Sequence, residues 1–157
     1  MEKTISLKKT REDAEKMYRE GQFYCSEAVV SAIRTNIAPE MPDALIAAAS
    51  GFPVGVGRAR CLCGAVSGGV IALGYFFGRT AASSPEDPKS VNAIKFAGEL
   101  QERFREAHNG VLCCHIHTKE EYMKAGKLQE QCITFTGDMA AITAEIIARE
   151  LNIEVRE

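Results

Sequence analysis

Residues 64 to 69 read GAVSGG and continue as the apolar run VIALGYFFG. We predict a helix over about residues 61–78. Gly64 and Gly68 are four residues apart and lie on one face of it, as do Ala65 and Gly69. A helix face with so little side-chain volume lets another helix backbone come very close. We therefore expect several helix ends to converge around this segment.

The rest of the chain also has the pattern of successive helices. Apolar residues recur at three–four spacing, and glycine, proline or capping residues separate the runs. In the long helix the stripe formed by Phe96, Leu100 and Phe104 is the expected core face. The other predicted helices span about 6–21, 25–36, 42–51, 88–108, 118–126 and 129–151.

No stretch alternates in the manner of a strand, and no repeat or heptad run is present. The sequence predicts an all-α fold, a single helical domain over residues 1–157 with about six to seven helices. Gly137 lies inside the last predicted helix, where glycine costs about 1 kcal/mol relative to alanine. Its presence there indicates a close approach by another element.

Composition and charge exclude several classes of protein. A formal net charge of −2 gives no basic surface for nucleic acid or anionic lipid. The longest apolar stretch, Val70 to Phe77, is too short to span a membrane. The first sixteen residues lack the apolar core of a signal peptide, so we expect a cytoplasmic protein. Six cysteines in a reducing compartment are then metal ligands or redox thiols rather than structural disulfides.

Four of the six cysteines fall at predicted helix N-termini. Cys25 opens the second helix, Cys61 and Cys63 open the fourth, and Cys132 lies in the first turn of the last. A helix N-terminus carries about half a positive charge, which favours thiolate over thiol. Positive charge from nearby arginines adds to this effect beside Cys63, so these sulfurs suit metal binding or nucleophilic chemistry.

The spacings exclude the common short motifs. No C-x2-4-C pair is present for a zinc knuckle, and the C-x-x-C of thioredoxin is also absent. Val111 stands where covalent haem attachment requires a cysteine before Cys114 and His115. The loop GFPVGVGR lacks the Lys-Ser/Thr of a phosphate loop, so we interpret it as a turn leading into the Cys63 helix. His108, at a helix end, and His117 need no role beyond solvated histidines.

Five segments together resemble a known family. They are GQFYCSEAVV, SGFPVGVGR with CGAVSG, QERFREAHNG, CCHIH and EQCITFTG, in that order over about residues 8–150. This order is similar to that of the redox-active proteins named for their C–GCAxxG–C–C cysteine pattern. A related domain occurs in split-Soret cytochrome c, where it accompanies haem and an iron–sulfur centre.

The resemblance implies a set of site residues. The four defining cysteines of the family fall on Cys25, Cys63, Cys114 and Cys132. Cys113 matches a second cysteine present in some members, and Cys61 looks like an extra. At His115 the chain departs from the pattern, where arginine is expected, so His115 and Cys113 are additional candidate ligands.

Three functions are compatible with this reading. The first is electron transfer by an iron–sulfur cluster, expected to be [2Fe–2S], on four thiolates. The second is metal-free thiol–disulfide chemistry, with Cys63 and Cys114 as the catalytic pair or with the vicinal cysteines cycling. The third is a non-catalytic helical module with structural zinc or buried thiols. The expected partner is a redox protein, and the small-residue faces also suit a homodimer.

Overall fold

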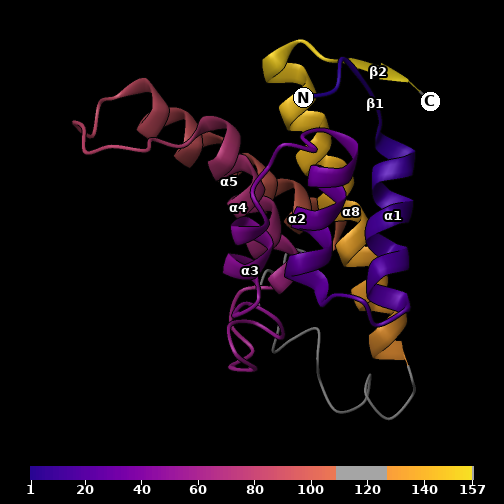
Figure 1. Cartoon of the computed structure of the whole chain (residues 1–157). Coiled ribbons are helices and arrows are strands. Elements are labelled where there is room, and N and C mark those ends of the chain that lie inside the picture. Colours follow the sequence, from indigo (N-terminus) through magenta and orange to yellow (C-terminus); the bar gives the residue numbers. More distant parts are fainter. Residues whose placement is uncertain (109–126, 157) are drawn as a thin grey trace.

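The computed structural model describes residues 1–108 and 127–156, and it is almost entirely helical there (Figure 1). The prediction of an all-α fold is confirmed, with six helices in the described ranges. The short helix expected over about 118–126 lies outside them. The elements are β1 (Thr4–Ser6), α1 (Leu7–Arg19), α2 (Cys25–Asn36), α3 (Asp43–Ala49), α4 (Gly64–Phe77), α5 (Pro88–Ala107), α8 (Lys127–Leu151) and β2 (Glu154–Arg156).

Capping residues set the helix ends where the sequence indicates them. The Ser6 hydroxyl accepts a hydrogen bond of 3.1 Å from the Lys9 amide at the start of α1. Asp87 accepts one of 2.8 Å from the Lys89 amide at the start of α5, whose first residue is proline. Such caps satisfy amides that have no partner within the helix. The bounds predicted for these helices are therefore close to those observed.

Two short strands were not expected from the sequence. β1 precedes α1 and β2 follows α8, and the two pair in parallel with Ile5 opposite Val155. With three residues each, they are too short to show an alternating pattern. They join the ends of α1 and α8 at the top of Figure 1, close to both termini.

The core lies where α1, α2, α4, α5 and α8 meet. The expected stripe of α5 is buried, with Phe96, Leu100 and Phe104 at 2% exposure or less. Across the outer edge, two nitrogens of Arg149 on α8 donate to the two carboxylate oxygens of Glu99 on α5, at 2.7 and 2.8 Å. No helix in the described ranges is long and apolar enough to cross a membrane.

At Gly68 of α4 the backbones of α4 and α2 lie very close together. A Cβ atom there would lie 2.5 Å from the Ser26 carbonyl oxygen and 2.9 Å from the Ser26 Cα. These are backbone atoms, which cannot rotate away. The absence of a side chain at Gly68 therefore sets the separation of the two helices, as the bare face of the sequence predicts.

A second close approach joins α1 to α8. A Cβ on Gly137 would lie 2.3 Å from Glu15 Oε1 and 2.6 Å from Glu15 Cγ. The prediction that Gly137 marks a close contact is confirmed. The two helices run antiparallel and side by side (Figure 1), and the Glu15 side chain occupies the space that Gly137 leaves.

We predict opposite effects for alanine at two glycines of α4. Gly68→Ala should lower the free energy of unfolding by about 1–3 kcal/mol, because the new methyl group overlaps the Ser26 backbone. Gly74→Ala meets no atom within 4 Å and should raise it by about 0.5–1 kcal/mol through helix propensity. Urea denaturation followed by circular dichroism measures both. Equal effects from the two substitutions would contradict the close packing of α4 on α2.

Candidate thiol site

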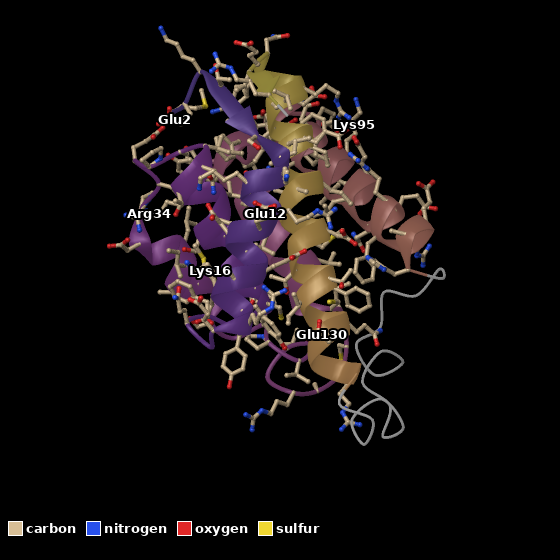
Figure 2. All side chains as sticks on the ribbon, turned by 90° about the vertical axis from the view of Figure 1, so that its right-hand side faces the viewer. Glu2, Glu12, Lys16, Arg34, Lys95 and Glu130 are labelled. Atoms are coloured by element: carbon tan, nitrogen blue, oxygen red, sulfur yellow. The ribbon has the colours of Figure 1, made fainter. Side chains whose placement is uncertain are left out.

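Four chain segments meet at one end of the bundle. The end of α1, the start of α2, the loop before α4 and the start of α8 all lie toward the bottom of Figure 1. In Figure 2, the labels for Lys16 of α1 and Glu130 of α8 mark this half of the molecule, while Glu2 and Lys95 mark the opposite half. Three of the predicted site cysteines belong to these segments.

Cys25 is the first residue of α2, and its sulfur lies against α4. A Cβ on Gly64 would lie 2.6 Å from Cys25 Sγ. The start of α2 is held in place by Glu27, whose carboxylate accepts from the Tyr24 amide at 2.9 Å and from the Ser50 hydroxyl at 2.7 Å. The glycine of the CGAxxG segment thus leaves the space that this half-buried sulfur occupies.

Cys63 is the N-cap residue of α4 and is 8% exposed. Because the helix starts at Gly64, Cys63 stands at its positive end, next to the glycine that contacts Cys25. Cys61 was predicted to open the same helix, but it lies three residues before it and is exposed. The helix starts later than expected because residues 54–58 and Arg60, which precede it, have positive φ and cannot belong to a right-handed helix.

Residues 54–58 form a left-handed turn ahead of Cys63. All five have positive φ, from 53° at Val54 to 68° at Gly55. This conformation costs a residue other than glycine about 1–2 kcal/mol, and here it includes two valines. Hydrogen bonds of 2.9 Å from the Val56 amide to the Phe52 carbonyl and of 3.0 Å from the Cys61 amide to the Gly55 carbonyl hold it. The loop is thus a hydrogen-bonded turn that leads into α4, as the sequence predicts.

Cys132 approaches the same region from α8. The sequence predicts Cys132 in the first turn of α8. Because α8 begins at Lys127, Cys132 lies in the second turn instead. The sulfur is half-buried. Burial raises the pKa of the Cys132 thiol, and a hydrogen bond with Tyr18 of α1 lowers it in part. The helix dipole is weaker at this position than at Cys63.

Tyr18, near the end of α1, is a half-buried residue whose pKa is affected by the three described site cysteines. Its pKa is raised well above the ordinary value, first by burial, then by the charges of Cys132 and Cys25, the hydrogen bond to Cys132 and the charge of Cys63. The Tyr18 hydroxyl therefore lies within electrostatic reach of all three sulfurs. No sequence motif marks Tyr18 as part of the site.

His108 fixes the point where α5 ends beside α8. Its Nε2 is 3.0 Å from Asp138 Oδ2, and Asp138 also forms an ion pair with Arg11 of α1. The imidazole ring packs on Phe135, with 4.4 Å between ring centroids. Phe135 is three residues after Cys132, so the end of α5 contacts α8 one helical turn from Cys132. His108 is thus part of a packed contact, although the sequence indicated only a solvated histidine.

The remaining predicted site residues lie outside the described ranges. These are Cys113, Cys114 and His115, which fall within residues 109–126. Among the residues that the structure does describe, no group of three or more histidine, cysteine, aspartate or glutamate side chains is arranged to hold a metal ion. Cys25, Cys63 and Cys132 belong to segments at the same end of the bundle, and these three described cysteines do not form such a group.

Comparison with known proteins identifies the family. A family model described as "Putative redox-active protein (C_GCAxxG_C_C)" matches residues 23–146. The chain belongs to this family. No significant match was found among curated proteins or among solved structures. The matched region contains all six cysteines of the chain, whereas α1, with Tyr18, lies before it.

We predict that the four described cysteines differ in reactivity. In the reduced, metal-free protein, a short pulse of iodoacetamide should label Cys61 first, the half-buried Cys25 and Cys132 later and Cys63 last. Labelling of the buried Cys63 sulfur should be on the order of tenfold or more slower than that of Cys61, because it requires local opening. Peptide mass spectrometry measures the four rates, and the same pulse in urea is the control. Equal rates for Cys61 and Cys63 in the native protein would contradict the burial described above.

Proposed function

We propose that this redox-active protein transfers electrons with an iron–sulfur cluster bound by Cys25, Cys63, Cys114 and Cys132. One observation carries the proposal. Cys25 Sγ lies against Gly64, the residue after Cys63, and α8 brings Cys132 to the same end of the bundle, although the three cysteines are far apart in the sequence. Four thiolates are the ligand set of such clusters.

The donor chemistry of the described residues fits this group. Sulfur ligands suit iron–sulfur clusters, and three of the four come from separate elements that meet at one end of the bundle. A cluster of two irons spreads its ligands over two metal centres, so it needs a wider arrangement than a single ion. The lack of a compact ligand group among the described residues therefore counts against a single zinc ion more than against a cluster.

A short length of chain joins the fourth cysteine to the end of α5. Cys114 is six residues after His108, and the ring of His108 packs on Phe135, one turn from Cys132. Six residues of extended chain span about 20 Å at most. This limit supports Cys114 as a ligand, with Cys113 and His115 as further candidates.

The surroundings of the site offer positive charge. Two ferric ions and two sulfides carry a charge of about +2, so four thiolates leave a net charge of about −2 on the site. The N-termini of α2 and α4 direct their positive ends toward this region. Arg58 adds positive charge in the left-handed turn of the loop that leads to Cys63. When bound, the cluster would supply a one-electron couple, and these groups would set its potential.

We predict that Cys63→Ser abolishes cluster binding, whereas Cys61→Ser retains it. The two cysteines are two residues apart, but only Cys63 caps α4 beside Cys25. Both variants and the unchanged chain are purified without oxygen and assayed for iron, sulfide, zinc and visible absorption. The proposal requires absorption at about 400–600 nm and equal iron and sulfide in the unchanged chain and in Cys61→Ser.

The same assay separates the other functions. One zinc per chain without a redox response would replace the cluster by a structural ion. A full cluster in Cys63→Ser would show that the ligand assignment is wrong. A colourless, metal-free protein that forms a reversible disulfide would favour thiol exchange.

The contact between Cys25 and Gly64 favours thiol exchange as the second candidate function. Cys63, at the N-terminus of α4, would attack the disulfide of a substrate, form a mixed disulfide and release one thiolate. Cys25 would then attack the Cys63 sulfur, releasing the second thiolate and leaving a Cys25–Cys63 disulfide. The disulfide substrate is the oxidant in this sequence, and it leaves reduced by two electrons.

A further inference from the structure

We propose that the outer face of α5 binds α5 of a second copy of this chain, with the two helices antiparallel. Ile94 of each copy then packs beside Gly98 of the other. This surface does not include the site cysteines, so the inference goes beyond the proposed function and does not depend on a cluster. The sequence associates a homodimer with small-residue faces, but the glycines at the start of α4 are buried within the chain.

Two large apolar side chains of α5 are exposed to solvent. Ile94 is 72% exposed and Val91 is 49% exposed. They lie three residues apart on the side of the helix opposite the buried Phe96 and Leu100. The start of α5 and the segment before it project from the other helices in Figure 1, and the label for Lys95 marks one edge of the molecule in Figure 2. A second chain can therefore reach both side chains, and covering them would remove apolar surface from water.

Gly98 leaves a gap in the same face of α5. It is exposed, it is four residues after Ile94, and a Cβ atom there would meet nothing within 4 Å. In contrast, a Cβ atom on Gly68 or on Gly137 would overlap another part of this chain. A glycine inside a helix lowers its stability relative to alanine. Close approach by a second chain would account for Gly98.

The outer face of α5 has the spacing of a socket for a side chain of another helix. Residues at i, i+3, i+4 and i+7 surround one depression on a helix, and a side chain of a facing helix packs into it. On α5 the socket consists of Gly98, Gln101, Glu102 and Arg105. The glycine widens one corner, which gives space for a branched side chain such as Ile94 of a second copy. Two copies related by a two-fold axis make this contact twice.

Charge determines the relative direction of the two helices. Lys95 and Glu102 are exposed and seven residues apart, so they lie on the same side of α5. With Ile94 in the socket of an antiparallel partner, Lys95 comes beside Glu102 of the second copy, whereas in a parallel pair each would face its own like charge. The 3.8 Å contact of Glu102 with Arg105 of the same chain is exposed and does not prevent this pairing. This matching selects a second copy as the occupant.

Sedimentation velocity of the full chain measures the association. One pair of helices buries less surface than a permanent dimer, so we expect a reversible dimer that appears between about 10 µM and 1 mM. Ile94→Asp should give a monomer over the same range, because it would bury an unpaired charge in the socket. Circular dichroism shows whether this variant is folded, as the exposure of Ile94 leads us to expect. A monomeric unchanged chain at the highest concentration, or undiminished association of folded Ile94→Asp, would overturn the proposal.

Alanine at Gly98 separates contact between copies from folding of one copy. Gly98→Ala should stabilise α5 in the single chain, yet its methyl group would fill a corner of the socket and weaken the dimer by about tenfold. Gly74→Ala also meets no atom within 4 Å and is the matched control, since it should leave the dimer unchanged. Equal dimer affinities of these two variants would contradict the placement of Ile94 beside Gly98.

Reciprocal charge exchange tests the direction of the helices. Lys95→Glu and Glu102→Lys should each weaken the dimer by about fivefold, because like charges then meet at both ends of the contact. The variant with both changes should regain the affinity of the unchanged chain. Lys8→Glu combined with Glu12→Lys exchanges an exposed pair on α1 and is the control. Single changes without effect, or a double change that fails to restore association, would overturn the antiparallel arrangement.

Discussion

The contact between the backbones of α2 and α4 is the constraint on which the rest of the molecule depends. At Gly68 the two helices are so close that a methyl group would overlap the Ser26 main chain. One turn earlier, the same closeness places the Cys25 sulfur on Gly64, beside the residue that begins α4. The packing of α2 on α4 therefore also sets the position of the Cys25 sulfur beside Cys63. Moving the helices apart to accommodate larger side chains would also move two candidate ligands apart.

The helices α1 and α8 form a second pair, which packs against α2 and α4 and contributes Cys132 to the site. Its two helices are joined at one end by the strands and near the other by the crossing at Gly137. With both ends fixed, α1 has little freedom to slide along α8. This geometry keeps the end of α1 beside the first turns of α8, where Cys132 lies.

Much of the fold could be predicted, because helix caps and apolar spacing are local signals. Ser6, Asp87 and the stripe around Leu100 act through neighbours a few residues away, so the sequence alone shows them. The two strands depend on partners far along the chain, because β1 and β2 lie near opposite ends of the sequence. Valine in a left-handed conformation contradicts its local preference, so the sequence could not predict this conformation, which hydrogen bonds among residues 51–61 hold. Grouping Cys25, Cys63 and Cys132 was possible only through a resemblance that covers the whole pattern.

The left-handed turn at residues 54–58 also has an electrical consequence. Peptide dipoles add only while successive units point the same way, and a reversal of hand interrupts that sum. α3 and α4 are close in the sequence, yet the turn prevents them from merging into one long helix with one pair of poles. α4 consequently starts with its own positive pole at Cys63. Because the reversed turn interrupts the helical backbone, the positive end of the α4 dipole stays at Cys63.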